Sequence, residues 1–540
     1  MNIEDTLKRM AASDITQVRM AWCDLHGELR STTLMPLAVE EALRDGVGMV
    51  GTLALGDTSD RTAFQVFESG GINSGVSSMP DFAHAANLLL RPALGSYQEL
   101  PWAPGTAWLQ GQLCHADGRH ASIDTRHALQ TAIDQLEAQG LGLRCGLAVE
   151  FYIYKIESTR PQLDPELAAW PGLPPAVSML HPGYHQLSEQ YSDMCDAPLR
   201  MVRETAQALG LPLVSLNIEL GPSQFKAVFE PTDAMTAADN MVLFRSAVRQ
   251  ALRRAGYHTT FMCKPPFAAT VCSHWHVQQY LVQLEDGGNA FALPPPAEAQ
   301  ADWYKRAMAP LQALLPIAKP LAAASYLSAT GCHYLAGLLA HAAGTTALTN
   351  PSINAYSCAY ARFAPNASAH IGSDYNTSAY NTSAYNTSAY NTATPRFAVW
   401  GHDNQGAMLR VIAPPGNLAG TCIENRVGEP MANPYLYLAS QIYAGLDGMA
   451  RKLAPPLATV SPYATDAAKV SSTASAVSAL PLPTTLADAL DALQSDAVLC
   501  AAFGTTFVDY FSHIKRQEIA RHHAAPDPID WQRREIFARF

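Results

Sequence analysis

The sequence predicts a mixed α+β protein with a small N-terminal domain and a much larger second domain. Three observations favour this class. The chain has 540 residues, 48% of them hydrophobic and 15% charged, which is typical of a globular protein with a large core. From residue 107 onward, long helical patterns alternate with apolar strand patterns. A proline- and glycine-rich stretch at 100–106 separates the two regions.

Charge and cysteine content argue against several classes of function. The formal net charge of −11 argues against non-specific nucleic-acid binding. The ten cysteines show no repeated spacing and no Cys-x-x-Cys pair, so we expect neither a disulfide framework nor a zinc module, and a reducing cytoplasm fits. The N-terminus does not resemble a signal peptide, and no uninterrupted apolar run reaches membrane length. We therefore expect neither a nucleic-acid nor a membrane partner.

The first hundred residues predict a small mixed domain that begins with a hairpin. Residues 18–23 have a strand pattern, Asp24-Leu25-His26-Gly27 predicts a turn, and 28–34 predicts the returning strand. A helix is expected at 36–46. The simplest interpretation of Asp24 and Gly27 is structural, because both residue types favour tight turns.

The second domain begins with helices and strands in alternation. The predicted helices are 125–139, 200–209 and 232–256, and the predicted strands are 148–154 and 212–220. Glu150 and Glu219 lie on these strands, and Glu150 stands among apolar residues. A buried carboxylate is costly unless it meets a cation. Each glutamate is therefore either half of an ion pair or a ligand.

The stretch 261–276 is predicted to be central to the fold. Residues 261–267 predict an apolar strand that ends in a proline-rich turn, and a second strand carries His274 and His276. Because strand side chains alternate, both imidazoles point to the same face. Such a pair holds a metal ion or a phosphate, or consists of two structural histidines.

A metal site needs more ligands than two histidines. Glu150, Glu219, His274 and Glu424 all lie on strand-like segments. Together they offer hard carboxylate oxygens with a single imidazole, which is the ligand set that Mg²⁺ or Mn²⁺ prefers.

The order of these segments resembles the glutamine synthetase family, and the resemblance covers nearly the whole chain. The matching stretches are Asp24-Leu25-His26-Gly27-Glu28-Leu29-Arg30, Leu100-Pro101-Trp102-Ala103-Pro104-Gly105, Glu150-Phe151-Tyr152, Glu219-Leu220-Gly221-Pro222-Ser223-Gln224, Phe261-Met262-Cys263-Lys264-Pro265, His274-Trp275-His276, Asn350-Pro351, Asn354-Ala355-Tyr356, Glu424-Asn425-Arg426, Asn433-Pro434-Tyr435-Leu436, Lys515-Arg516-Gln517-Glu518 and Asp530-Trp531. The resemblance implies a β-grasp domain at 1–103. It also implies a catalytic domain at 104–540, whose curved antiparallel sheet forms a half-barrel flanked by helices.

The resemblance also implies a reaction and an assembly. Members of the family use ATP and divalent ions to phosphorylate a carboxylate, and ammonia or an amine then displaces the phosphate. They form ring-shaped homo-oligomers with active sites between neighbouring subunits. By resemblance, Glu150 and Glu219 bind one Mg²⁺ or Mn²⁺ ion, and His274 and Glu424 bind another. His276 and Arg410 face the nucleotide phosphates, and Arg410 and Arg426 are the catalytic arginines.

Several positions depart from the family pattern. Ala148 replaces the first carboxylate of a Glu-x-Glu pair, and Lys226 stands where a third carboxylate is expected. A glycine-rich substrate stretch reads Ala269-Thr270-Val271-Cys272, and Cys358 and Gln405 replace arginines. Losing two carboxylates and gaining an ammonium shifts the charge of the site by about three units, so two divalent ions would be poorly neutralised. The sequence then favours a single metal ion, with no metal at all as the other possibility.

A five-residue repeat, Tyr-Asn-Thr-Ser-Ala, occupies 374–393. Its period matches neither a helix nor a strand, and we interpret it as an irregular surface insert. By resemblance it lies where the family carries a flap with a catalytic Glu, for which we find no replacement.

Two hypotheses follow. The first is an ATP-dependent ligase joining a small carboxylic acid to an amine, with a reaction other than ordinary glutamine synthesis. The second is an inactive pseudoenzyme that acts as an oligomeric scaffold or regulator. The retained acids, histidines and arginines favour the ligase, and the changed positions favour the pseudoenzyme. The sequence therefore leaves open whether the chain is an enzyme, and we favour the ligase.

Overall fold

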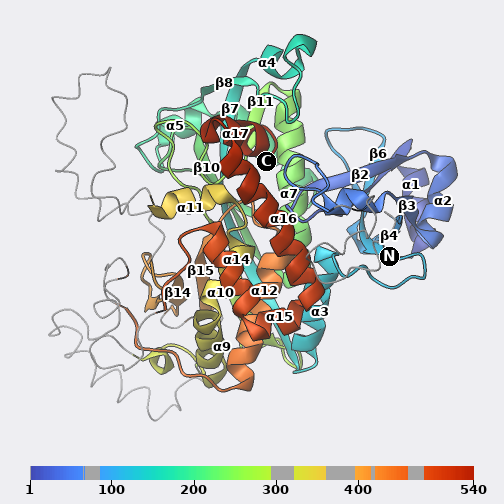
Figure 1. Cartoon of the computed structure of the whole chain (residues 1–540). Helices are drawn as coiled ribbons and strands as arrows, with labels where there is room; N and C mark the ends of the chain where they lie inside the picture. The colour runs from blue at the N-terminus through green and yellow to red at the C-terminus, as the bar shows by residue number, and fades with distance from the viewer. Residues whose placement is uncertain are drawn as a thin grey trace, which may run out of the picture.

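The computed structural model describes residues 2–64, 66, 86–293, 322–360, 396–414, 417, 420–459, 462 and 480–540. Figure 1 shows a small N-terminal part, in blue, beside a much larger body. The repeat at 374–393 and the predicted flap lie outside the described residues.

The N-terminal part is a sheet with strand order β2-β1-β6-β4-β3, and β5 pairs with β6. Strands β1 and β6 run parallel, and the other neighbours are antiparallel. The predicted hairpin and helix are confirmed as β1, β2 and α2, and the arrangement is compatible with a β-grasp. The elements are α1 (Ile3–Ala12), β1 (Gln17–Cys23), β2 (Leu29–Leu34), α2 (Pro36–Asp45), β3 (Val47–Met49), β4 (Leu88–Pro92), β5 (Gln98–Glu99) and β6 (Thr106–Cys114).

The division at 103/104 stays a prediction. Strand β6 belongs to the N-terminal sheet, because it pairs with β1, β4 and β5. Strand pairing therefore favours a boundary after Cys114, and we propose that position for the start of the larger domain.

The larger domain is built on a second sheet with strand order β13-β14-β15-β12-β7-β10-β9, and β8 and β11 both pair with β7. Except for the parallel pair β13–β14, the described pairings are antiparallel. The predicted strands 148–154 and 212–220 are confirmed within β7 and β9. The strands are β7 (Leu141–Ser158), β8 (Ala176–Met179), β9 (Leu213–Ile218), β10 (Gln224–Asp233), β11 (Tyr257–Thr260), β12 (Trp275–Gln283), β13 (Trp400–His402), β14 (Leu409–Ile412) and β15 (Cys422–Gly428).

Helices cover this sheet, and the predicted helices at 125–139, 200–209 and 232–256 are confirmed as α3, α6 and α7. The helices of the larger domain are α3 (Thr125–Glu137), α4 (Arg160–Leu163), α5 (Glu189–Met194), α6 (Asp196–Ala208), α7 (Ala234–Arg254), α9 (Ala329–Ala340), α10 (Ala342–Thr349), α11 (Ile353–Tyr360), α12 (Pro434–Ala450), α14 (Leu486–Ser495), α15 (Ala497–Phe503), α16 (Thr505–Ala524) and α17 (Pro528–Gln532).

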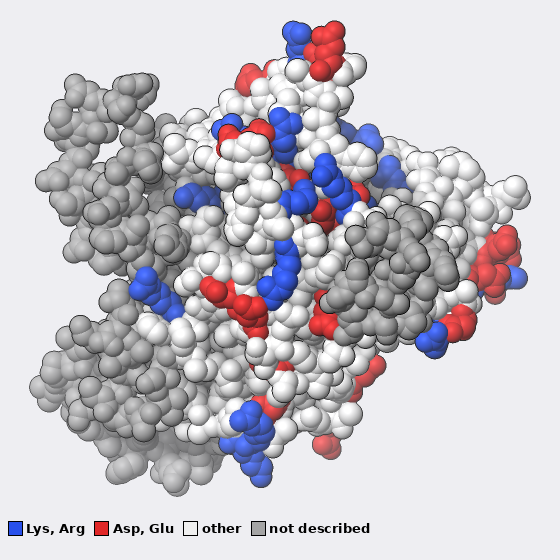
Figure 2. All heavy atoms as spheres, viewed as in Figure 1, with Lys and Arg blue, Asp and Glu red and all other residues white. Residues whose placement is uncertain are grey.

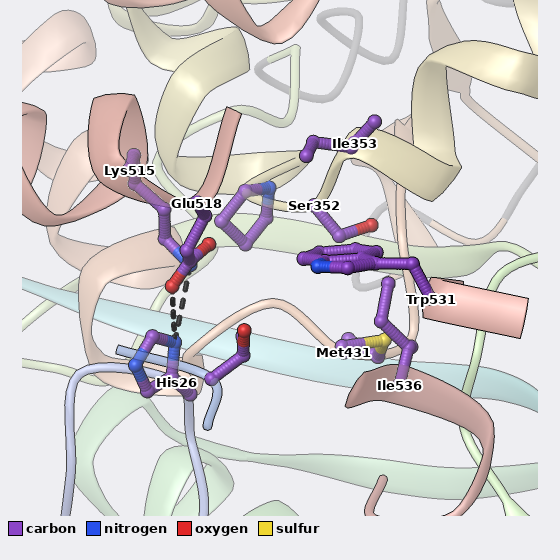
Figure 3. Close-up of a pocket in the computed structure, with 10 residues that line it drawn as sticks. His26, Ser352, Ile353, Met431, Lys515, Glu518, Trp531 and Ile536 are labelled. Atoms are coloured by element: carbon purple, nitrogen blue, oxygen red, sulfur yellow. Dashed lines mark hydrogen bonds and ion pairs between the residues drawn. The ribbon is translucent and has the colours of Figure 1, made fainter. Parts of the chain in front are cut away.

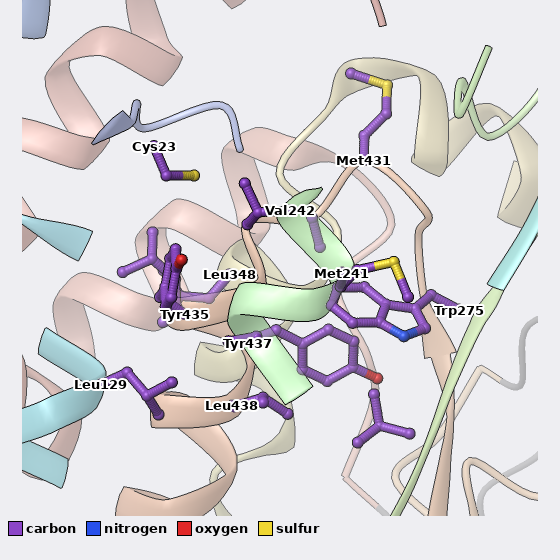
Figure 4. Close-up of a cluster of buried hydrophobic side chains, with 14 of the residues drawn as sticks. Cys23, Leu129, Met241, Val242, Trp275, Leu348, Met431, Tyr435, Tyr437 and Leu438 are labelled. Carbon is purple, nitrogen blue, oxygen red and sulfur yellow. The ribbon is translucent and has the colours of Figure 1, made fainter. Parts of the chain in front are cut away.

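Helix α12 is the centre of the core. It is buried on nearly every side, and it packs against α3, α7, α9, α10 and α15. Trp275 of β12 is fully buried, and its ring meets that of Tyr437 on α12 edge-on, with centroids 5.0 Å apart (Figure 4). Because side chains alternate along a strand, this contact turns His276 toward the opposite face of the sheet.

The strand predicted at 261–267 is wrong. Strand β11 ends at Thr260, and the chain then forms a loop that closes where Ser273 N–H donates to Cys263 O at 2.7 Å. The stretch is apolar because Phe261, Met262 and Cys263 are buried although they belong to no strand. Phe261 stacks on Phe151 with ring centroids 5.3 Å apart. Periodicity alone does not separate a buried loop of this kind from a short strand.

The turn of the β1–β2 hairpin is held by the larger domain. Arg245 of α7 is buried, and its guanidinium donates to three backbone carbonyls: Gly27 O at 3.0 Å, Pro430 O at 2.7 Å and Ala432 O at 2.9 Å. Gly27 has a φ of +81°, and a Cβ there would lie 2.6 Å from the guanidinium. The glycine therefore serves both the turn and this close contact.

Figure 2 shows that Lys and Arg are interspersed with Asp and Glu on the part of this face that the described residues form. On this face the described residues form no continuous basic area of the kind that binds nucleic acid. Among the described helices, none alone is long and apolar enough to cross a membrane. Only α15 and α16, taken together and bent by 102° where they meet, pass that test.

A buried carboxyl group predicts a pH-dependent stability. Glu429 follows β15 and accepts hydrogen bonds from Ser352 N–H at 2.7 Å and Ser352 Oγ–H at 2.6 Å. Burial raises the pKa of Glu429 to about 7, although Ser352 opposes the shift. Because the folded-state pKa is raised, the stabilisation is fully present below the unfolded pKa near 4.5 and is lost as the pH rises through about 7.

We therefore expect the parent protein to lose up to about 3 kcal/mol of unfolding free energy, relative to Glu429→Gln, between about pH 4.5 and 7. Urea unfolding of both proteins across this range measures the difference. Other titrating groups cancel because both proteins carry them. A pH-independent difference would show that Glu429 is ionised in the folded protein throughout.

Candidate active site

The candidate site is a row of polar side chains on one face of five neighbouring strands. Strand pairing sets the row, because residues opposite each other across a ladder share a face. Arg410 lies opposite Glu424, His276 opposite Ala148, and Lys226 opposite Glu150. From one side to the other, the row comprises Arg410 on β14, Glu424 and Arg426 on β15, His276 on β12, Glu150 on β7, Lys226 on β10 and Glu219 just after β9.

Lys226 binds both carboxylates at one end of the row. Its Nζ lies 2.9 Å from Glu150 Oε1 and 2.6 Å from Glu219 Oε1. Burial lowers the pKa of Lys226, but the opposite effect of Glu150 and Glu219 is larger. The net pKa is therefore above its ordinary value, and the ammonium stays charged.

The two carboxyl groups differ in acidity. Burial raises the pKa of Glu150, but Lys226 and His274 lower it further, and the net shift is downward. Burial and the charge of Glu150 raise the pKa of Glu219. Of the two groups, Glu150 is the stronger acid.

The histidine pair occupies the middle of the row. The rings of His274 and His276 are 6.1 Å apart between centroids, and His274 Nδ1 lies 3.7 Å from Glu150 Oε2. Potential ligand atoms of Glu150, His274 and His276 all lie within 4.8 Å of one another. Burial, with a contribution from Arg426, lowers the pKa of His276 to about 3, so this imidazole is neutral at pH 7.

Glu424 lies between two arginines. Its Oε2 is 2.6 Å from Arg426 and 3.4 Å from Arg410, and its Oε1 accepts from Gln278 Nε2 at 3.3 Å. Although burial raises it, the pKa of Glu424 is lowered to about 2 by His276, Arg426 and Arg410. Because His276 is neutral at pH 7, the arginines are the cations that act there. Glu424 is thus not part of the compact group formed by Glu150, His274 and His276.

Sequence reasoning missed Gln186. Its Nε2 donates to Glu219 Oε2 at 2.7 Å from the loop that joins β8 to α5. That loop runs alongside the end of β9, because Tyr184 N–H donates to Leu220 O and Leu187 N–H donates to Ile218 O. A glutamine in a loop carries no pattern that would have indicated this contact.

The expectation of no disulfide is wrong for one pair. Cys272 and Cys358 form a disulfide with a Cα–Cα separation of 6.0 Å, and Cys263 Sγ lies 3.4 Å from Cys358 Sγ. The partners are 86 residues apart, a separation that the cysteine spacing could not reveal. Cys272 and Cys358 are two of the departures from the family pattern, so the structure joins two changes that looked independent in the sequence.

A second polar cluster lies apart from the strand face, in a cavity of about 20 Å³ beside α16 (Figure 3). Lys515 Nζ donates to His26 Nδ1 at 3.1 Å and to Glu518 Oε2 at 3.0 Å. Burial and Lys515 hold the pKa of His26 well below its usual range, so the ring is neutral and Nδ1 is the acceptor. The cavity has room for about one water molecule. We interpret it as a contact between the hairpin and α16 rather than a substrate site.

The fold and the row of carboxylates, imidazoles and guanidinium groups define a class: an α+β protein whose sheet face is suited to anionic, phosphate-bearing ligands. The model of the glutamine synthetase catalytic domain matches residues 122–326 and 316–534. The chain belongs to the glutamine synthetase family. The predicted fold class, a curved half-barrel sheet with flanking helices, is confirmed with it.

The similar proteins include a gamma-glutamylanilide synthase as well as glutamine synthetases. Gamma-glutamylanilide synthase from an Acinetobacter species is 30% identical, covering 99% of this chain and 95% of that protein. Glutamine synthetase from Thermus thermophilus is 29% identical, covering 80% of this chain and 81% of that protein. The solved structure of GmaS with ADP has a TM-score of 0.67 at 22% identity, with 98% of each chain covered. That structure supports the fold.

The similarity assigns this chain to the ATP-dependent amide-forming ligases of the family. Members of the family are oligomeric, use ATP and divalent ions, and act on an acid and an amine. The comparisons give no support to the pseudoenzyme hypothesis.

Proposed function

We propose that this protein joins the side-chain carboxylate of glutamate to a primary amine larger than ammonia, with aromatic amines as the foremost candidates. One observation carries the proposal: the two arginines around Glu424 lie on the same sheet face as the two histidines and the two other glutamates. Similarity to a gamma-glutamylanilide synthase along 99% of the chain supports an amine acceptor of that kind.

The reaction has two steps. A glutamate carboxylate oxygen attacks the γ-phosphorus of ATP, and the bond to the ADP oxygen breaks. The amine nitrogen then attacks the acyl carbon, phosphate leaves, and the nitrogen gives up one proton. Both steps move negative charge onto phosphoryl oxygens, which fixed cations stabilise.

Arg410 and Arg426 are proposed as the catalytic arginines at the transferring phosphoryl group. Each donates to Glu424, which keeps the guanidinium groups oriented before any ligand binds. Arg426 is also held by Gln405, whose backbone oxygen accepts from Arg426 Nε at 2.9 Å. His276, neutral at pH 7, offers one ring nitrogen as a hydrogen-bond donor to a nucleotide phosphate.

A divalent ion would neutralise the ATP phosphates. We propose that His274 and His276, with a carboxylate oxygen of Glu150, hold it on the histidine side of the row, because their potential ligand atoms lie within 4.8 Å of one another. Glu424, whose oxygens accept from Arg426, Arg410 and Gln278, would instead orient the two arginines. The ring of His276 makes no hydrogen bond to any described residue, and imidazole with carboxylate is a donor set better suited to Mn²⁺ than to Mg²⁺. We also propose that the protein is cytoplasmic and forms a ring-shaped homo-oligomer with active sites between neighbouring subunits.

The amine side is proposed to accept an apolar group. Tyr184 and Leu187 are 67% and 68% exposed in the loop that carries Gln186, beside Glu219. Exposed apolar side chains next to a charged site favour a ligand that is itself partly apolar.

We expect the purified protein, given glutamate, ATP and Mn²⁺, to form amide from aniline with a kcat/KM at least 10²-fold above that for ammonia. Aniline can place its ring against the exposed side chains of Tyr184 and Leu187, whereas ammonia gains nothing from them. Cys358 and Gln405 stand where two arginines are expected, and losing one cationic contact typically costs about 10²–10³ in rate, so ordinary glutamine synthesis should also be slow in absolute terms. Product analysis by mass spectrometry with each amine measures this. Equal or faster glutamine formation from ammonia would contradict the proposal.

A further inference from the structure

At the Lys226 end of the row, every oxygen of the two carboxylates already has a hydrogen-bond donor from the protein. Glu150 Oε1 accepts from Lys226 at 2.9 Å, and Glu150 Oε2 accepts from the backbone N–H of His274 at 2.9 Å. Glu219 Oε1 accepts from Lys226 at 2.6 Å, and Glu219 Oε2 accepts from Gln186 Nε2 at 2.7 Å. Each of the four oxygens therefore has a protein donor.

We infer that Lys226 is a built-in cation that takes the place of a divalent ion between Glu150 and Glu219, and that no metal ion binds between these two carboxylates. An ion that entered would have to displace the ammonium from both glutamates. It would also have to lie beside that ammonium, since a protonated lysine offers donors and no lone pair to a metal. Both conditions oppose binding of Mg²⁺ or Mn²⁺.

The fold fixes the backbone of Lys226 between two strands. Strand β10 is paired on both sides, with Lys226 opposite Glu150 of β7 and opposite Asn217 of β9. Its neighbours Phe225 and Ala227 are fully buried, so the backbone is fixed, and the Lys226 side chain is only 17% exposed. A cation attached to this backbone stays with the site, whereas a metal ion exchanges with solvent.

Gln186 is a positioning residue in the same arrangement. It occupies the oxygen of Glu219 that Lys226 leaves open and adds no charge. Carboxylates with spare lone pairs would still attract a cation, so Gln186 completes what Lys226 begins. The metal content of the site is then limited to the histidine side. This inference rests on the proposed function only for the identity of the site, and metal content is measured without turnover.

The test is the number of Mn²⁺ ions bound per chain, measured by calorimetry and by elemental analysis after gel filtration, with thermal melting of the same samples. In the parent background, Glu219→Gln should leave the number of bound ions unchanged. Lys226→Glu should bind one ion per chain more than the parent does. Without Mn²⁺ the Lys226→Glu variant should also melt at a lower temperature than the parent, and its melting temperature should rise again when Mn²⁺ is added.

Lys226→Arg is the matched control, because it keeps the charge and should gain no ion. Lys226→Gln serves if the glutamate variant does not fold. It should also melt at a lower temperature than the parent, since two buried carboxylates lose their cation. A parent protein that loses one bound ion on Glu219→Gln would overturn the inference, because Glu219 would then be a ligand. So would a folded Lys226→Glu variant that gains no ion.

Discussion

Replacing Arg426 by Gln is expected to lower kcat/KM for ATP-dependent amide formation by about 10²–10³-fold, the cost of losing one preorganised donor to developing charge. Arg426 lies on β15 and is fixed by Glu424 and by the backbone of Gln405. The fold should survive, because Glu424 keeps Arg410 and Gln278 as partners. Steady-state kinetics with glutamate, ATP and aniline measure the loss, and a melting curve checks the fold.

Two variants make the result specific. Arg426→Lys keeps a cation and should recover part of the rate, although it loses the two-pronged geometry of the guanidinium. Arg44→Gln removes an exposed arginine whose partner is Glu40 on the same helix, and it should leave kinetics unchanged. If Arg426→Gln retains turnover within about threefold of the parent, its role at the phosphoryl group is wrong.

The second large effect concerns stability. Arg245→Met is expected to lower the free energy of unfolding by about 3 kcal/mol or more, because three buried carbonyls lose a charged donor at once. The bonds to Gly27, Pro430 and Ala432 join the N-terminal hairpin to α7 and to the segment before α12. Urea unfolding measures the loss. Limited proteolysis should in addition show faster cleavage of the hairpin turn.

Arg254→Met is the matched control. This residue also lies on α7, but its side chain is exposed, so the change should alter stability by less than about 0.5 kcal/mol. Equal effects of the two substitutions would mean that the guanidinium of Arg245 contributes little beyond helix propensity.

Much of the fold could be predicted because its elements have regular local patterns. The hairpin around Asp24 and Gly27 and the long helix α7 carry turn residues or helical spacing that the structure confirms. The stretch after Thr260 was mistaken for a strand because its apolar residues serve a buried loop. Local patterns report burial, and only strand pairing decides whether a buried segment joins a sheet.

The site shows the same division. Lys226 could be predicted to lie opposite Glu150, because a cation at a position that resembles a ligand requires a nearby acid. The bond from Gln186 to Glu219 and the disulfide between Cys272 and Cys358 could not be predicted. Each joins segments whose proximity depends on the packing of the whole domain. The arginine pair around Glu424 was assigned from resemblance, and its spacing alone carries no such information.

The proposed reaction makes the amide through an acyl phosphate. The most direct measurement uses glutamate labelled with ¹⁸O in its side-chain carboxylate, with ATP, Mn²⁺ and aniline, followed by mass analysis of the inorganic phosphate. We expect one ¹⁸O atom in the phosphate for each amide formed, because the carboxylate oxygen that attacks ATP leaves with the phosphoryl group. Amide formation with unlabelled phosphate, or ATP hydrolysis without amide, would contradict it.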